Sequence, residues 1–309
     1  MTEPDSTSGP ASSPAVGLPL APPRFHAFRR FIGSLAHRPS AVAGLLILAA
    51  FIVVAVIAPV FIGPDQLDVT RVDGPLMGPP SASYPLGTDE NGRSVLALVA
   101  WGARTSLTIG IIATVMTVIL GGSIGLVAGH YQGKVGAGLM HLTDWFIALP
   151  SLPLAIALSV VIGQGSLSII IAIAVTSWTG TARLVRAQTL AVGARPFIER
   201  ARALGAGNRQ IIMRQVLPNV MPLILVSSIL TVASAILAEA TLTFLGLGDP
   251  TTVSWGSMLN AAFAQGAVTV GAWWYLLTPG IAIGLVVLGF TLTGRAIEYV
   301  INPQTMGRP

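Results

Sequence analysis

Few side chains in this 309-residue sequence are of a type that does chemistry, and they form no catalytic pattern. The absence of cysteine excludes disulfides and thiolate chemistry. Lys134 follows a glycine, but Ala128 and Val135 stand where a phosphate-binding loop needs its first glycine and its Ser or Thr. The sequence has neither an HExxH motif nor a Ser, His and Asp arrangement typical of a nucleophile. We therefore expect neither catalysis nor ATP binding in this chain.

The remaining candidates for chemistry are four ionisable side chains in or beside apolar segments. His130 and His141 flank a short turn without clustered partners, so we expect no metal site. Glu239 lies inside an apolar segment, and an ionisable group in a membrane span is a candidate functional residue. For Glu239 we favour helix packing or gating over substrate specificity. Asp144 could pair with an arginine of the central polar segment, and we expect it to anchor its helix at the membrane interface.

Composition indicates an all-α, polytopic membrane protein. The chain is 53% hydrophobic and 9% charged, with a mean hydropathy of +0.76, whereas soluble domains carry about 25% charged residues. Its apolar runs are about 20 residues long and do not alternate, which is typical of helical spans and not of barrel strands. The net charge of +5 comes from basic residues at the ends of these runs, so it does not indicate nucleic-acid binding.

We predict six transmembrane helices, and two prolines within the third, Pro150 and Pro153, should kink it. The expected spans are residues 41–62, 105–129, 139–162, 167–184, 220–247 and 278–300. Residues 1–23 are rich in Pro, Ser and Gly and are predicted to be a disordered tail. The remaining divisions are an N-terminal region with the first span (24–62), an external loop (63–104), a five-span core (105–300) and a second tail (301–309).

An even number of spans places both termini on one side of the membrane. All seventeen basic residues except Arg71, Arg93 and Arg104 fall on that side, which the positive-inside rule makes cytoplasmic. We therefore expect a multi-pass protein of the cytoplasmic membrane with both termini in the cytoplasm.

The central polar segment, residues 191–219, lies on the same side and predicts two short amphipathic helices. Pro196 fits a first helical turn, Gly205 fits a helix end, and Asn208 could cap a second helix that ends before Pro218. The apolar positions are spaced at helical intervals, and they are Phe197, Ala201 and Leu204 in the first helix and Ile212 and Val216 in the second. The single acid is Glu199, among Arg195, Arg200, Arg202, Arg209 and Arg214.

The order of residues in this segment resembles the EAA signature of ABC importer permeases, which reads Glu-Ala-Ala, three residues, Gly, nine residues, then Ile-x-Leu-Pro. The matching residues are Glu199, Ala201, Gly205, Leu217 and Pro218, while Arg200 replaces the first alanine and Gln215 stands at the isoleucine position.

Two other segments, 87–107 and 236–259, resemble the peptide and nickel permeases of this family, with Ser94 at the usual position of an aspartate. The resemblance implies the C-type subunit of a dipeptide or oligopeptide importer, with the type I permease fold. Its implied partners are a homologous second permease, two ATPase subunits that hold ATP and Mg, and an external binding protein.

The resemblance also makes the 191–219 loop the contact with the ATPase. We expect Phe197, Leu204 and Ile212 to anchor this contact and Glu199 to pair with an ATPase arginine. The expected coupling residues are Phe197, Glu199, Ala201, Leu204, Gly205, Ile212, Leu217 and Pro218. Nickel, glutathione and haem remain alternative cargoes. A secondary transporter or channel is the alternative class, which the scarcity of charge in the spans and the lack of an evident inverted repeat disfavour.

Overall fold

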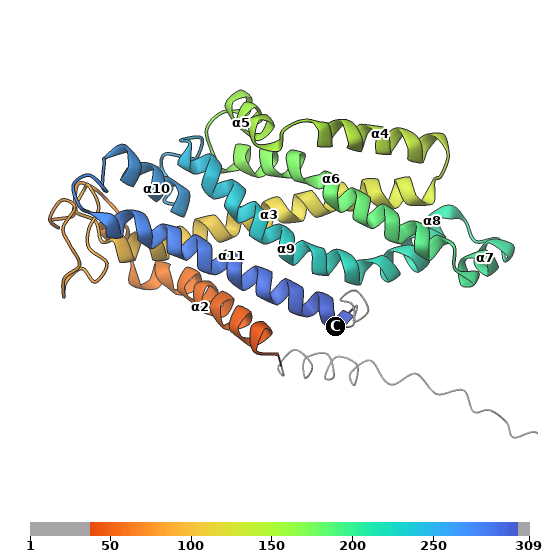
Figure 1. Cartoon of the computed structure of the whole chain (residues 1–309), viewed down its shortest axis with the longest axis horizontal. Helices are drawn as coiled ribbons and strands as arrows, with labels where there is room; N and C mark the ends of the chain where they lie inside the picture. Colours follow the sequence, from red (N-terminus) through yellow and green to blue (C-terminus); the bar gives the residue numbers. More distant parts are fainter. Residues whose placement is uncertain (1–37, 302–309) are drawn as a thin grey trace, which may run out of the picture.

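The computed structural model describes residues 38–301, which form a bundle of long helices (Figure 1). The helices in chain order are α2 (Pro39–Phe61), α3 (Val95–His130), α4 (Lys134–Ala148), α5 (Ser151–Ile162), α6 (Ser166–Gly193), α7 (Pro196–Ala203), α8 (Asn208–Ile211), α9 (Leu217–Phe244), α10 (Trp255–Ala264) and α11 (Trp273–Ile301). A π-helical turn, Ile212–Val216, joins α8 to α9, so 208–244 is one helical run of 37 residues. The predicted tail 1–23 and residues 302–309 lie outside the described part.

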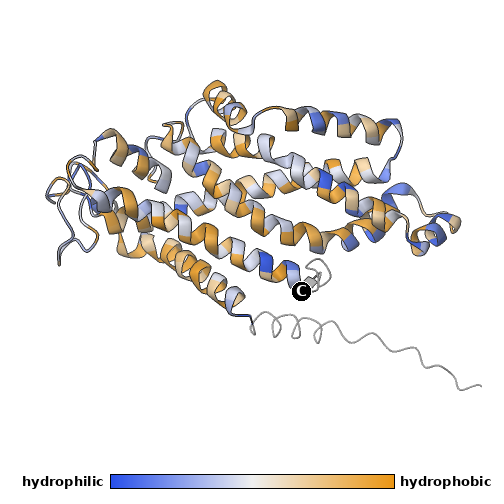
Figure 2. Cartoon of the chain, viewed as in Figure 1, coloured by the Kyte–Doolittle hydropathy of each residue, from blue (hydrophilic) through white to orange (hydrophobic). Residues whose placement is uncertain are grey.

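The prediction of an all-helical membrane protein is confirmed. Five helices of the described chain are long and apolar enough to cross a membrane, and the bent pair α4 and α5 provides a sixth candidate. Apolar residues run along the middle of these helices, while polar residues gather towards the ends (Figure 2). Helices suit this environment because their backbone hydrogen bonds are all made within the segment.

The third predicted span is wrong as a single kinked helix, because α4 and α5 meet at 91°. Leu149 has an extended backbone (φ −79°, ψ 133°), the conformation that a following proline favours. Pro150 then precedes α5, and Pro153 lies in its first turn, where a missing N–H costs no helical hydrogen bond. The two prolines therefore begin a new helix instead of kinking an old one.

Helix α3 begins at Val95, well before the predicted start at Thr105, so the predicted loop 63–104 ends as a loop at Ser94. The hydroxyl of Ser94 accepts a hydrogen bond from the N–H of Ala97, which caps the helix. The 36 residues of α3 span about 54 Å, so α3 extends beyond a hydrocarbon layer of about 30 Å. Helix α6 likewise continues past the predicted end of its span, to Gly193.

Helices α3 and α6 form the central pair of the bundle, and glycines on α3 allow them to approach closely. Gly121, Gly125 and Gly129 recur every four residues, a spacing that places them on one face. A side-chain carbon at Gly125 would lie 2.5 Å from the carbonyl oxygen of Ala182, and one at Gly129 would lie 2.6 Å from Cβ of Thr189. This face therefore fixes the position of α6, which leads directly into the central polar segment.

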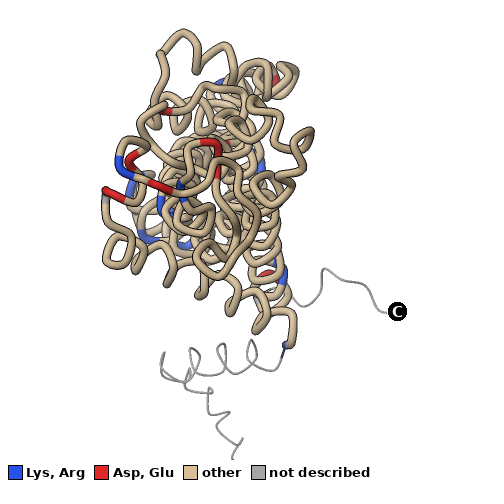
Figure 3. The backbone as a smooth tube through the Cα atoms, turned by 90° about the vertical axis from the view of Figure 1, so that its left-hand side faces the viewer, with Lys and Arg blue, Asp and Glu red and all other residues tan. Residues whose placement is uncertain are grey.

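The two ends of the bundle differ in charge. We call the end that holds residues 131–133 and 194–207 the basic end, and the end that holds residues 62–94 and 245–272 the acidic end. The guanidinium of Arg38 lies 3.6 Å from the ring centroid of Tyr299, which joins the start of α2 to the end of α11. Figure 3 views the bundle from the acidic end, where Asp and Glu lie beside a few arginines.

We expect Gly125→Ala to destabilise the chain by about 1–3 kcal/mol, because the added methyl group forces α3 away from α6. Gly122→Ala is the matched control, because its methyl group would meet no neighbour within 4 Å. That control should be neutral or stabilising by up to about 1 kcal/mol, from helix propensity. Thermal unfolding of the two detergent-solubilised variants measures the difference, and equal unfolding temperatures would contradict the packing described.

Candidate functional site

The first helix of the central polar segment, α7, begins and ends where the sequence predicts. Pro196 is its first residue, and Gly205 follows its end with a positive φ of 84°. The N–H of Gly205 donates to the carbonyl of Arg202 (2.9 Å), and the N–H of Ala206 donates to that of Ala201 (3.0 Å). This pair of bonds is a Schellman motif, which suits glycine because a side chain is strained at positive φ.

The second helix of the segment differs from the prediction at both ends. Gly207, not Asn208, occupies the capping position. The chain also remains helical through Pro218, because Leu217 keeps helical angles (φ −54°, ψ −46°) despite the proline that follows. Its N–H bonds to Ile212, five residues earlier, so the wider π-helical turn joins α8 to α9 without a break. The segment is therefore continuous with a membrane span.

The apolar side chains of the segment divide into two groups. Ile198, Ala201, Ile211 and Val216 are buried, and the three larger ones pack in a core with residues of α6 and α9. The predicted anchors Phe197 and Leu204 instead remain 38% and 88% exposed. Thus Ala201, which the motif marks as a coupling residue, faces the protein's own core.

We call residues 194–214 the basic tip, because they project from the basic end (Figure 1). Its five arginines and Glu199 are exposed, and within the described residues Glu199 makes no ion pair. Met213 is 55% exposed, whereas the predicted anchor Ile212 is partly buried. Of the other predicted coupling residues, Gly205 and Pro218 are exposed and Leu217 is partly buried. The surface of the basic tip therefore carries exposed apolar side chains between arginine side chains.

Two of the ionisable residues considered in the sequence, His130 and Asp144, make polar contacts. Nε2 of His130, at the end of α3, lies 3.1 Å from Oδ1 of Asn208. The carboxylate of Asp144 on α4 lies 2.6 Å from the guanidinium of Arg183. The predicted arginine partner of Asp144 thus lies on α6, before the polar segment and not within it. Because both side chains are 53% exposed, this ion pair contributes only about 0–1 kcal/mol.

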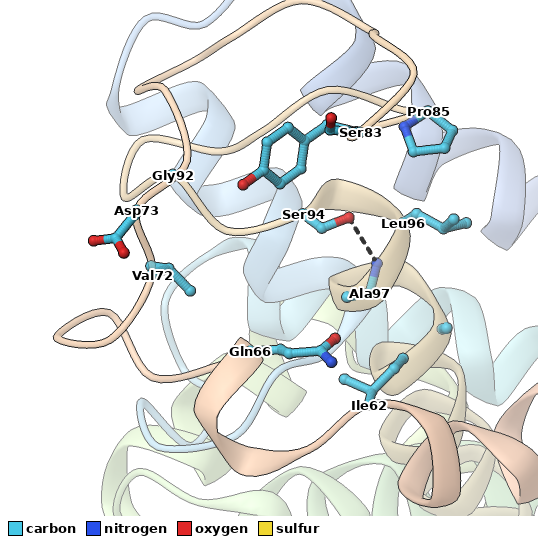
Figure 4. Close-up of a pocket in the computed structure, with 12 residues that line it drawn as sticks. Ile62, Gln66, Val72, Asp73, Ser83, Pro85, Gly92, Ser94, Leu96 and Ala97 are labelled. Atoms are coloured by element: carbon cyan, nitrogen blue, oxygen red, sulfur yellow. Dashed lines mark hydrogen bonds between the residues drawn. The ribbon is translucent and has the colours of Figure 1, made fainter.

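The run Gly-Thr-Asp ahead of α3, residues 87–89, forms a hydrogen-bonded turn at the acidic end. Buried Asp89 accepts hydrogen bonds from the backbone N–H of Asn91 (3.0 Å) and of Arg93 (2.7 Å), and from Nε of Arg93 (2.7 Å). Ser94 then caps α3 beside a hollow of about 400 Å³ (Figure 4). Serine and aspartate are both favoured at helix N-caps, and Ser94 occupies that position here.

Glu239 is fully buried in the last turns of α9. Oε1 of its carboxyl group lies 3.5 Å from the hydroxyl of Thr243 on α9, and the hydroxyls of Ser106 on α3 and Ser254 ahead of α10 are close neighbours. The structure thus brings together three helices at this carboxyl. Among the described residues, no group of three or more His, Cys, Asp or Glu side chains is spaced to hold a metal ion.

Sequence reasoning missed the buried face of the basic tip and the hydroxyl partners of Glu239. Ile198 and Ile211 were detectable as apolar neighbours of Phe197 and Ile212, but helical spacing alone does not say which side faces inward. Ser254 carried a signal, because Ser-x-x-Ser ahead of an apolar run is compatible with a capped helix. Ser106 could not be paired with Glu239 without the fold.

Two segments of the chain match known protein families. Residues 121–306 match the family described as binding-protein-dependent transport system inner membrane component. Residues 27–80 match the N-terminal membrane domain of oligopeptide transport permease C.

Relatives and a solved structure agree with these matches. The di/tripeptide permease DppC of Pseudomonas aeruginosa is 36% identical over 96% of this chain and 97% of its own length. The dipeptide permease DppC of Bacillus subtilis is 37% identical, over 85% and 82%. The glutathione permease GsiD of Pectobacterium atrosepticum is 34% identical, over 73% and 74%.

The fold is shared with a chain of the inward-facing MetNI methionine ABC transporter, at a TM-score of 0.54 and 18% identity, over 67% of this chain and 96% of that one. This similarity concerns the fold alone. Together with the family match and the relatives, it shows that the chain belongs to the inner-membrane permeases of binding-protein-dependent ABC transporters.

Proposed function

We propose that this chain is the C-type permease subunit of an ATP-driven importer of short peptides. The cargo is supported by the relatives, whose names specify di/tripeptides, dipeptides and glutathione, which is itself a peptide. Selectivity is expected to reside largely in an external binding protein that delivers the peptide. The remaining parts of the machine are a homologous second permease and two ATPase subunits that bind ATP and Mg.

One observation carries the coupling role, namely the exposure of apolar residues on the basic tip. Leu204 is 88% exposed and Phe197 is 38% exposed, although both lie at the end of the bundle and not along its membrane-facing middle. Burying a leucine in a partner contributes about 1.5–3 kcal/mol, whereas an exposed ion pair contributes about 0–1 kcal/mol. The apolar residues therefore supply most of the docking energy, and Glu199 and the arginines orient the contact.

The basic tip faces the cytoplasm in this proposal, together with both termini. Six basic residues support this orientation, because they lie in the basic tip or directly after residues 131–133. They are Lys134, Arg195, Arg200, Arg202, Arg209 and Arg214. Labelling of a Leu204→Cys variant from outside intact cells would contradict the orientation.

Uptake of a labelled dipeptide by vesicles that contain the complete complex should require ATP and should survive the collapse of ion gradients. Vesicles that lack the ATPase subunits are the control and should show no uptake, because this chain has no phosphate-binding loop. Uptake driven by an ion gradient in those control vesicles would support a secondary transporter instead.

Leu204→Asp and Gly205→Glu should leave the protein in the membrane but reduce ATPase co-purification about tenfold or more, since either places an extra charge in the apolar contact. Leu76→Asp is the matched control, because Leu76 is 73% exposed at the acidic end. Gly205→Ala separates the strain at positive φ, about 1–2 kcal/mol, from the effect of charge. Wild-type recovery of ATPase with Leu204→Asp, together with normal uptake, would exclude the coupling role.

A further inference from the structure

Glu239 is a buried carboxyl that the proposed coupling role does not use. It is 0% exposed near the acidic end of α9, and its Oε2 has no hydrogen-bond partner among the described residues. Burying such a group is costly unless it is bonded. Its other oxygen, Oε1, lies 3.5 Å from the hydroxyl of Thr243.

The hydroxyls around Glu239 connect it to the first turn of α10. The N–H of Trp255 donates to the hydroxyl oxygen of Ser106 (3.2 Å), and the N–H of Ser257 donates to that of Ser254 (3.2 Å). Because these oxygens accept from the backbone, their own protons are free to donate to the carboxyl of Glu239. The carboxyl thus lies beside two hydroxyls that accept hydrogen bonds from the first turn of α10, where a negative group is favoured.

Close packing holds α10 against the same place. A side-chain carbon at Gly256 would overlap the hydroxyl of Thr243 and lie 2.5 Å from the carbonyl oxygen of Ala240. The indole of Trp255 is fully buried, and its Nε1 donates to the carbonyl of Val99 on α3 (3.0 Å). Helix α10 is therefore packed against both α3 and α9 at this place.

The other side of α10 borders open space. Ser257, Asn260 and Ala261 line a hollow of about 650 Å³ at the acidic end, opposite the loop residues Asp68 and Arg93. Helix α10 thus separates this hollow from the interior of the bundle, and its position sets the size of the hollow.

The helix that carries Glu239 also begins at the basic tip. The run 208–244 is unbroken over 37 residues, about 55 Å, and connects the two ends of the bundle (Figure 1). This run, which continues through the π-helical turn and past Pro222, is a helical connection between the tip and Glu239.

We propose that Glu239 is a positioning residue that ties α10 to α9, so that ATPase closure at the basic tip moves α10 and reshapes the hollow at the acidic end. This inference rests on the proposed coupling function. It identifies α10 as the element that moves at the acidic end, and Glu239 as the side chain that couples α10 to α9.

The test measures α10 directly in the assembled complex. The chain lacks cysteine, so Phe263→Cys on α10 and Leu96→Cys on α3, 70% and 46% exposed, accept spin labels without background from this subunit. Double electron–electron resonance in nanodiscs then gives the distance between them with and without ATP. The wild-type distance should change with ATP. Glu239→Leu should retain the ATPase subunits, lose the ATP-dependent change, and reduce peptide uptake at least about fivefold.

Two variants control for damage to the fold. Thr241→Val removes an exposed hydroxyl that bonds only the carbonyl of Leu237 in the same helix, and it should behave as wild type. Ser106→Ala removes one hydroxyl donor beside Glu239 but keeps the carboxyl group. It serves as the test variant in place of Glu239→Leu if Glu239→Leu does not assemble with the other subunits. Glu239→Gln keeps hydrogen-bonding atoms and should restore part of the distance change.

The proposal is overturned if the distance still changes with ATP in Glu239→Leu or its substitute, or if α10 does not move in the wild type. Failure of this inference is separate from failure of the coupling role. If only the Glu239 link is wrong, Leu204→Asp still releases the ATPase while Glu239→Leu transports normally. If the coupling role is wrong, Leu204→Asp retains the ATPase.

Discussion

The packing of Ile198 and Ile211 into a core with residues of α6 and α9 is the interaction on which the position of the basic tip depends. It fixes the basic tip to two spans, so the tip cannot shift without moving them. If exposed ion pairs alone attached the loop, each pair would stabilise the attachment by only about 0–1 kcal/mol. The loop would then detach before it moved the helices. Because the π-helical turn keeps 208–244 continuous, the attachment reaches from one end of the bundle to the other.

This attachment explains why the exposed surface of the tip is free to serve a partner. Its inner side chains are used by the bundle, so Phe197, Leu204 and Met213 remain outside with the arginines. The family of this chain is that of the inner-membrane components of binding-protein-dependent transport systems. In the proposed function its contribution to transport is mechanical, and the buried Glu239 connects helices.

The features that sequence predicted are those set by local chemistry. Pro196 and Gly205 begin and end α7 because of backbone constraints that act within one turn, and hydropathy located the spans. The predictions were wrong where contacts between several elements determine the local structure. Two prolines produced a right-angled break after Leu149 instead of a kink, while Pro218 failed to end its helix because a π-helical turn preceded it. The orientation of Ala201 and the partners of Glu239 depended on tertiary packing, which no spacing within one segment records.

The most direct test of this account is hydrogen–deuterium exchange of the permease in nanodiscs, before and after its ATPase subunits are added. Residues 196–211 of the basic tip should become protected, because the exposed side of α7 and α8 is covered by the ATPase. Residues 62–94, at the acidic end, should exchange as before. Unchanged exchange in the tip while the ATPase is bound would contradict the central claim that this segment receives the mechanical work.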